Sequence, residues 1–280
     1  MTTRHPAAAP ATRAGRRLTA PATTIVTGPA GRLEVLVTGS GQPSTVFAHG
    51  LGGTIDSTRP FGSGVPGRRA FMHFRGYGAS DAGQVQWTYQ ALGEDLRAVA
   101  DQHRSTRVLG VSMGAGAVCA LLEQTPTRFE RVVLMLPAVI DRPRRDASLD
   151  RLLRLQELSD QADVAGIADH LLTEQPPEYR KRPEMRVWID SHAQALAGIG
   201  SRHALRALPN VVPVSQRGRL REVTSEVLVV GQEGDLAHPA ALARELATLL
   251  PRARVVILPP GGVMWGHRAR VRALISDFLA

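Results

Sequence analysis

Ser112 lies in the pentapeptide Gly-Val-Ser-Met-Gly of residues 110–114, which has the form G-x-S-x-G. An apolar run, residues 107–111, precedes the serine, and a good helix-forming segment, residues 115–123, follows it. This order predicts a strand, a sharp turn and a helix, with small neighbours that tolerate a strained backbone at the serine. The hydroxyl of Ser112 would then stand clear of the sheet as a nucleophile, and the N–H of Met113 would be free to stabilise an oxyanion.

A serine hydroxyl is a good nucleophile only when a neighbouring base takes its proton and an acid orients that base. In open α/β sheets such groups collect at the carboxyl ends of the strands. The polar residues at these ends include His49, Ser112, Asp235 and His267. They contain the chain order Ser, Asp, His that a hydrolase sheet requires. We therefore expect Ser112 as the nucleophile, Asp235 as the acid and His267 as the base.

Short apolar segments alternate with helical ones, which predicts an α/β fold: a mostly parallel, eight-stranded sheet with helices on both faces. The alternation lapses between residues 139 and 221, where amphipathic helices take over and predict an inserted helical cap. We expect a disordered tail at 1–21 and a core made of 22–138 and 222–280. The expected strands are 23–26, 33–37, 44–48, 69–74, 107–111, 131–136, 225–231 and 254–258. The expected helices are 88–103, 115–123, 149–158, 164–174, 183–197, 201–208, 239–250 and 268–279.

Five short motifs together resemble the α/β-hydrolase fold family, in its form with a serine nucleophile and a helical cap. The resemblance runs from about residue 23 to the C-terminus. It implies a catalytic triad of Ser112, Asp235 and His267, and an oxyanion hole formed by the backbone N–H groups of Leu51 and Met113. The motifs are HGLGG at 49–53, RGYGAS at 75–80, GVSMG at 110–114, GQEGD at 231–235 and GH at 266–267.

Other side chains could fill some of these roles. Glu233 would point to the opposite side from Asp235 if the strand continued, and Asp141 is the alternative acid that some relatives use. His238 lies three residues after Asp235, near an expected helix start, which is more typical of a surface or capping histidine. His49 is expected to support the oxyanion loop without titrating in catalysis.

One position departs from the family pattern. Relatives usually carry an aspartate two residues before the arginine of the R-G-x-G-x-S motif, and here that position holds His73. Because that acid is normally structural, we expect a changed local hydrogen bond and intact chemistry. A His73 side chain that reached the pocket would change the expected substrate.

These features predict a serine hydrolase that cleaves a carboxylic ester, thioester or lactone of a small to medium apolar substrate through an acyl-enzyme. A serine at position 112 argues against haloalkane dehalogenases and epoxide hydrolases, which use aspartate there. Phe61, Met72, Trp188 and Trp265 are the apolar residues that we expect near the substrate. The alternatives are a lyase, a C–C bond hydrolase or a perhydrolase on the same fold, and a non-hydrolytic ligand-binding protein.

The composition limits the kinds of partner and cofactor that we expect for this protein. The net charge of +9 arises largely from arginine, and five of the excess charges lie in residues 1–33. Elsewhere acids and arginines interleave, which is typical of a solvated surface, and only 4% of residues are aromatic, so we expect no nucleic-acid partner. No apolar run is long enough for a membrane span, and no apolar segment follows Arg16-Arg17, so cytoplasmic location is the default. The one cysteine, Cys119, excludes an internal disulfide, and we expect no metal and no nucleotide cofactor. The oligomeric state is left open.

Overall fold

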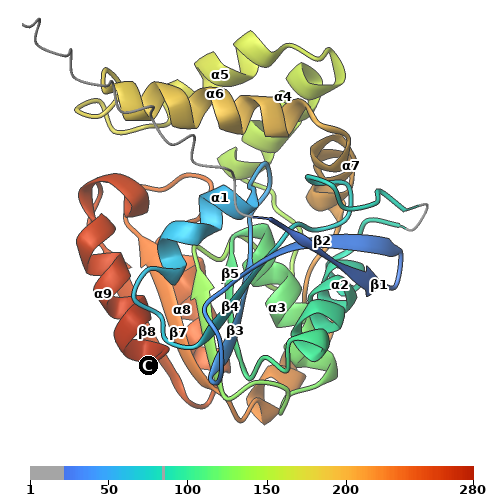
Figure 1. Cartoon of the computed structure of the whole chain (residues 1–280). Coiled ribbons are helices and arrows are strands. Elements are labelled where there is room, and N and C mark those ends of the chain that lie inside the picture. The colour runs from blue at the N-terminus through green and yellow to red at the C-terminus, as the bar shows by residue number, and fades with distance from the viewer. Residues whose placement is uncertain (1–21, 84–85) are drawn as a thin grey trace, which may run out of the picture.

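The computed structural model describes residues 22–83 and 86–280, so the expected disordered tail at 1–21 lies outside the described residues. The described part contains one eight-stranded sheet in the order β1-β2-β4-β3-β5-β6-β7-β8 (Figure 1). β1 and β4 each pair with β2 in antiparallel fashion, and all other neighbours are parallel. The mostly parallel sheet that the sequence predicts is therefore confirmed. The strands are β1 (Thr24–Gly28), β2 (Gly31–Thr38), β3 (Ser44–Ala48), β4 (Arg68–Met72), β5 (Arg107–Val111), β6 (Arg131–Met135), β7 (Glu226–Gln232) and β8 (Ala253–Leu258).

Helices cover both faces of this sheet, because each central strand is apolar on both sides. Val108 faces a cluster that α2, α3 and α8 complete, whereas its neighbour Leu109 faces a second cluster that α1 and α9 complete. This alternation is the period-two geometry of a strand buried on both faces. The core helices are α1 (Ile55–Thr58), α2 (Tyr89–Gln102), α3 (Met113–Gln124), α8 (Ala240–Leu249) and α9 (Arg268–Phe278).

Four helices between β6 and β7 lie above the carboxyl ends of the central strands and are called the cap helices here (Figure 1). They share an apolar cluster of their own, in which Leu155 of α4, Ile167 of α5 and Ile189 of α6 are almost completely buried. The cap helices therefore have a small core of their own. The cap helices are α4 (Ala147–Asp160), α5 (Val164–Thr173), α6 (Pro183–Ala197) and α7 (Ile199–Ala207).

Short helical turns join several of these elements, and the sequence analysis did not anticipate them. Their lengths of three to six residues leave too little periodicity for a pattern to detect. The 3-10 turns are Arg59–Gly62, Leu208–Asn210 and Arg217–Glu222, and a single π-helical turn spans Gly262–Gly266.

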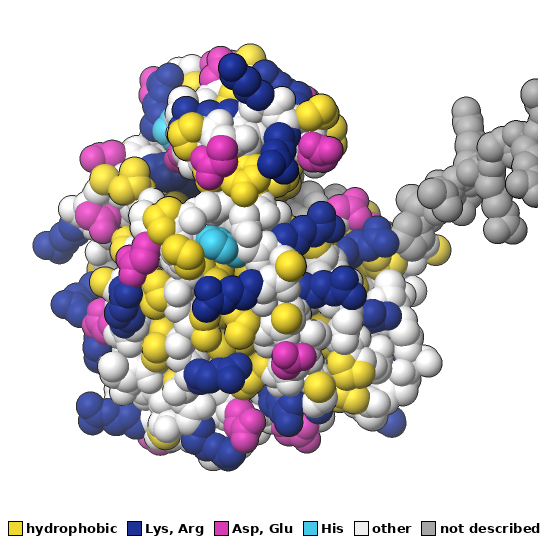
Figure 2. Space-filling view, turned by 90° about the vertical axis from the view of Figure 1, so that its left-hand side faces the viewer, with side chains coloured by type: hydrophobic (Ala, Val, Ile, Leu, Met, Phe, Trp, Pro, Cys, Tyr) yellow, Lys and Arg dark blue, Asp and Glu magenta, His cyan; other side chains and the backbone are white. Residues whose placement is uncertain are grey.

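The surface carries both signs of charge. In the view of Figure 2, arginine and lysine side chains are interspersed with acidic and apolar ones, and the cap stands as a lobe above the core. Many arginines pair with acids, as Arg217 does with Asp141 at 3.0 Å and with Glu245 at 2.7 Å. Within residues 22–83 and 86–280, none of the helices has the length and apolar character needed to cross a bilayer.

Candidate active site

Ser112 stands at a sharp turn between β5 and α3, with φ 51° and ψ −106°. This left-handed φ is strained for a serine, and close packing on either side maintains it. A Cβ on Gly110 would lie 2.5 Å from the carbonyl oxygen of Gly114, and a Cβ on Gly114 would lie 2.5 Å from the carbonyl oxygen of Ala48. Both glycines are therefore needed for β5, β3 and α3 to approach one another. The turn holds the Ser112 side chain where it is partly exposed.

The imidazole that contacts Ser112 belongs to His238. Its Nε2 lies 2.8 Å from the Oγ of Ser112, and its Nδ1 lies 3.0 Å from the Oδ2 of Asp235. With Nδ1–H donating to the carboxylate, Nε2 carries the lone pair that can accept the serine proton. The three side chains thus form a continuous Asp–His–Ser hydrogen-bonded chain.

Asp235 and His238 belong to one tight turn after β7. The Oδ1 of Asp235 accepts hydrogen bonds from the backbone N–H groups of Ala237 and His238, both at 3.0 Å, while Oδ2 faces the His238 ring. Burial alone would raise the pKa of the Asp235 carboxyl. The His238 charge and the hydrogen bonds from His238 and Ala237 outweigh burial, and they hold this pKa below its ordinary value. Asp235 is therefore ionised at neutral pH and can stabilise an imidazolium.

His267, which we expected as the base, does not occupy that position. Its Nε2 lies 2.8 Å from the carbonyl oxygen of Pro259 and 3.1 Å from that of Pro260, so this nitrogen is a donor to the loop after β8. The chain reaches His267 through two glycines with positive φ, Gly261 at 135° and Gly262 at 79°, and through the π-helical turn. The ring is thereby held at the start of α9, and the imidazole beside Ser112 is that of His238, which we expected to be a surface or capping histidine.

The two alternative acids are engaged elsewhere. Glu233 contacts Arg244, and Asp141 pairs with Arg217 at 3.0 Å. Neither carboxylate hydrogen-bonds to a histidine in the part of the chain that the structure describes. Asp235 is thus the acid that the geometry favours.

Two backbone N–H groups are available beside Ser112. Those of Leu51 and Met113 donate no hydrogen bond to any of the described residues. Met113 is the first residue of α3, so its N–H lies at the positive end of the helix dipole. Both groups are therefore free to donate to an oxyanion, and their role as oxyanion donors stays a prediction.

The oxyanion loop, residues 49–54, is fixed by its own hydrogen bonds. The Gly53 N–H donates to the Gly50 carbonyl at 3.0 Å. The Nδ1 of His49 hydrogen-bonds to the same carbonyl at 2.7 Å, while its Nε2 accepts from the Phe74 N–H at 3.1 Å. Burial lowers the pKa of His49 to about 3, so the ring stays neutral. His49 therefore supports the loop, as expected.

The other end of the loop is held by His73. Its Nε2 accepts a hydrogen bond from the Ile55 N–H at 2.9 Å, and its Nδ1 donates to Glu34 at 2.8 Å. Glu34 in turn accepts from the Ala79 N–H at 2.7 Å. An aspartate could accept from Ile55 but could not donate to a second carboxylate. This is the changed local hydrogen bond that we expected at position 73, and it commits both nitrogens of the ring.

The arginine of the R-G-x-G-x-S motif, Arg75, also has a structural role. Arg75 is buried and forms two hydrogen bonds of 2.7 Å to Asp95 of α2, with a third to the Ala91 carbonyl at 2.9 Å. This ion pair ties the loop after β4 to α2, so the motif contributes to the site by fixing its surroundings.

The four residues expected near the substrate lie in three places. Phe61 and Met72 are buried in the two core clusters on opposite faces of the sheet. Trp188 of α6 and Trp265 of the π-helical turn are partly buried and meet edge to face, with ring centroids 6.1 Å apart. Trp188 and Trp265 therefore connect the cap helices with the core, whereas Phe61 and Met72 take part in its packing.

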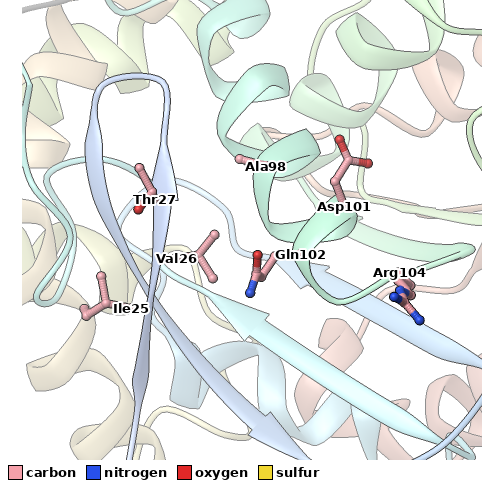
Figure 3. Close-up of a pocket in the computed structure, with 7 residues that line it drawn as sticks. All are labelled: Ile25, Val26, Thr27, Ala98, Asp101, Gln102 and Arg104. Atoms are coloured by element: carbon pink, nitrogen blue, oxygen red, sulfur yellow. The ribbon is translucent and has the colours of Figure 1, made fainter.

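A separate surface hollow lies between β1 and the end of α2 (Figure 3). None of the residues that line it belongs to the Asp–His–Ser chain or to the oxyanion loop, and Asp101 there pairs with Arg128 at 2.6 Å. Elsewhere, no group of three or more His, Cys, Asp or Glu side chains suited to a metal ion occurs within residues 22–83 and 86–280. The residues that line the hollow are Ile25, Val26, Thr27, Ala98, Asp101, Gln102 and Arg104.

The fold and the turn at Ser112 define an α/β hydrolase. The sequence profile of the alpha/beta hydrolase fold matches residues 43–264, and the chain belongs to this family. BpoC of Mycobacterium tuberculosis, whose name describes a candidate non-heme bromoperoxidase, is 27% identical over 248 residues, which cover 80% of this chain and 87% of BpoC.

Solved structures agree on the fold. An esterase from Exiguobacterium antarcticum superposes with a TM-score of 0.77 at 20% identity, over 91% of this chain and 98% of the esterase. An enol-lactonase from Burkholderia xenovorans LB400 superposes with a TM-score of 0.74 at 22% identity, over 91% of this chain and 99% of the lactonase. At these identities the likeness establishes the architecture, and the chemistry must be argued from the site itself.

Proposed function

We propose that this protein is a serine hydrolase that cleaves carboxylic esters, thioesters or lactones through an acyl-enzyme on Ser112. The observation that carries the proposal is the hydrogen-bonded chain from Asp235 through His238 to Ser112, beside two backbone N–H groups that donate to none of the residues in 22–83 and 86–280. We assign His238 as the base in place of His267. An esterase and an enol-lactonase share this fold, which is compatible with the same reaction class.

Acylation begins when Nε2 of His238 takes the proton of Ser112 and Oγ bonds to the substrate carbonyl carbon. The electron pair of the carbonyl moves onto its oxygen, which the N–H groups of Leu51 and Met113 stabilise. Asp235 stabilises the imidazolium and keeps the ring oriented. When the carbonyl reforms, the bond to the leaving oxygen or sulfur breaks, and His238 delivers its proton to the leaving atom.

Deacylation repeats these steps with water. His238 takes a proton from a water molecule, and the oxygen of that water attacks the acyl carbon. The collapse of the second tetrahedral intermediate breaks the bond to Oγ, and Ser112 recovers its proton from His238. No group outside the Asp–His–Ser chain and the two N–H donors is required for either half of the cycle.

Labelling with a fluorophosphonate probe tests this proposal, because the probe phosphonylates an activated serine. We expect labelling of the wild type and its loss in Ser112→Ala. Ser276→Ala is a matched control, because Ser276 lies on α9 and donates to the Ala273 carbonyl at 3.1 Å. A folded wild type that is not labelled, and that hydrolyses no p-nitrophenyl ester, would favour the ligand-binding alternative.

Perhydrolysis is a second candidate, favoured by the name of BpoC. Hydrogen peroxide would replace water in deacylation, so that the acyl group leaves as a peracid and Ser112 is regenerated in the same way. Release of peracid from an ester in the presence of peroxide, lost in Ser112→Ala, would establish this activity. The same substitution should abolish hydrolysis of that ester, since both reactions share the acyl-enzyme.

A further inference from the structure

The cap helix α6 rests directly on the oxyanion loop. A Cβ on Gly52 would lie 2.6 Å from Cγ of Leu196 and 3.1 Å from Nε2 of His192, and both of these side chains belong to α6. Gly52 follows Leu51, whose N–H is one of the two proposed oxyanion donors. Nε2 of His192 therefore lies against Gly52, the residue next to a proposed oxyanion donor.

Aromatic contacts hold this imidazole in place. Its ring stacks on that of Trp188, with centroids 4.8 Å apart and an angle of 15° between the planes. Trp188 in turn meets Trp265 edge to face. The orientation of the His192 ring is thus set by packing between the cap helices and the loop after β8.

Neither ring nitrogen of His192 has a hydrogen-bond partner among the described residues, whereas those of His49 and His73 are all paired. The nitrogens of His192 are also not among the fully enclosed polar atoms that lack a partner. Both nitrogens therefore keep some contact with solvent. A polar group in this position can bind a substrate without first breaking a bond within the protein.

The ring is uncharged at neutral pH. Burial, with a smaller contribution from the Arg151 guanidinium, lowers the pKa of His192 to about 4. A neutral imidazole offers one N–H donor and one acceptor nitrogen. It would therefore recognise a neutral oxygen substituent better than a carboxylate.

We propose that His192 is a substrate-positioning residue that donates a hydrogen bond to an oxygen on the acyl chain, close to the reacting carbonyl. The assignment to the acyl side follows from the mechanism. The leaving group must face His238, which protonates it, and the carbonyl oxygen must face Leu51 and Met113, so the acyl chain is the remaining substituent. The substrate class is therefore an ester, thioester or lactone with an oxygen-substituted acyl group. This inference rests on the proposed function.

The test uses two esters that differ by one atom of the acyl chain. p-Nitrophenyl methoxyacetate carries an oxygen where p-nitrophenyl butyrate carries a methylene group. The ratio of their kcat/KM values depends partly on how reactive the two esters are by themselves. This contribution cancels when the ratio in a variant is compared with the ratio in the wild type. The fraction of folded enzyme also cancels in the ratio, because it affects both esters equally. The ratio can therefore be measured even in a variant that folds poorly.

We expect His192→Phe, which keeps the stacking on Trp188, to lower the methoxyacetate-to-butyrate ratio about three- to tenfold, the usual effect of one neutral hydrogen bond. His192→Gln, which restores an N–H donor, should recover part of this loss. His170→Phe is the control, because His170 is also a half-buried cap histidine but faces Glu174 at 3.3 Å. That variant should keep the wild-type ratio.

The outcomes separate the two proposals. Turnover of both esters by the wild type, with an unchanged ratio in His192→Phe, overturns the role of His192 and leaves the serine hydrolase intact. A ratio that falls equally in His192→Gln and His192→Phe also overturns it, because restoring an N–H donor at this position would then have no effect. Absence of both turnover and fluorophosphonate labelling overturns the proposed function, and the inference about His192 with it.

Discussion

The choice between two histidines is the sharpest prediction of this structure. His238 and His267 lie 29 positions apart in the sequence, and either could be the third member of a Ser–Asp–His order. Only His238 contacts both Ser112 and Asp235. We therefore compare His238→Ala with His267→Ala, each made singly in the full chain.

The contacts of each ring set the size of the expected effects. His238→Ala removes the group that accepts the serine proton, and loss of a single base of this kind lowers kcat by about 10⁴- to 10⁶-fold. His267→Ala removes a donor to the carbonyls of Pro259 and Pro260, in a partly exposed loop. The loss of such a hydrogen bond costs about 1 kcal/mol of stability, and kcat should stay within about threefold of the wild type.

The assay is the hydrolysis of p-nitrophenyl butyrate, with thermal unfolding measured on the same samples. A folded His238→Ala protein that is inactive, beside an active His267→Ala protein, supports the assignment. The reverse pattern would refute it, because it would mean that the working enzyme brings His267 to Ser112 and releases His238. Equal loss in both variants, with both folded, would also contradict a triad in which one histidine suffices.

Three further predictions concern the surroundings of the site. Asp235→Asn should lower kcat about 10⁴-fold, because the ring loses the charge that orients it. The pKa of Asp235 is depressed in the folded protein, so its charge stabilises the fold above about pH 4. The difference in unfolding free energy between wild type and Asp235→Asn, measured by denaturant titration, should therefore shrink as the pH falls below 4. Gly114→Ala should lower the unfolding free energy by about 2 kcal/mol and also reduce kcat, because the new Cβ meets a backbone carbonyl at 2.5 Å. Gly218→Ala is the control, because a Cβ there meets nothing within 4 Å. It should change neither quantity in the same unfolding and activity assays. Asp95→Asn should lower the unfolding free energy by about 3 kcal/mol, because it leaves Arg75 buried without its counter-charge; a change below 1 kcal/mol would mean that the ion pair is dispensable.

The sheet could be predicted from the sequence because its strands carry a strong local signal. β3, β5 and β6 are short apolar segments between glycines, prolines and polar residues, and each has the predicted extent to within one residue. A strand that is buried on both faces has no other stable environment, so composition is nearly sufficient to identify it. The same reasoning located the turn at Ser112, where glycines are required by direct backbone contacts.

The base could not be predicted in the same way, because its position depends on the path of a loop. His238 follows Asp235 by three residues, a spacing that by itself fits a surface or capping histidine equally well. What decides the outcome is the turn in which Asp235 accepts the N–H groups of Ala237 and His238, which curls the chain back so that the ring faces the carboxylate. The limits of the cap at 139 and 221, and the approach of Trp188 and Trp265 to a substrate, stay predictions.

The placement of the proposed acid and base in one turn changes what the fold has to achieve. When these two residues come from different loops, the spacing of two strands must set the distance between them. Here the distance between Asp235 and His238 is a local property of residues 235–238, and the sheet has only to bring this turn to Ser112. The Ala237 carbonyl within the turn accepts a hydrogen bond from Arg144 at 3.0 Å, and Arg144 lies in the segment that leads from β6 to the cap helices. The position of His238, the proposed base, relative to Ser112 is therefore set by β7 on one side and by the segment that leads into the cap helices on the other.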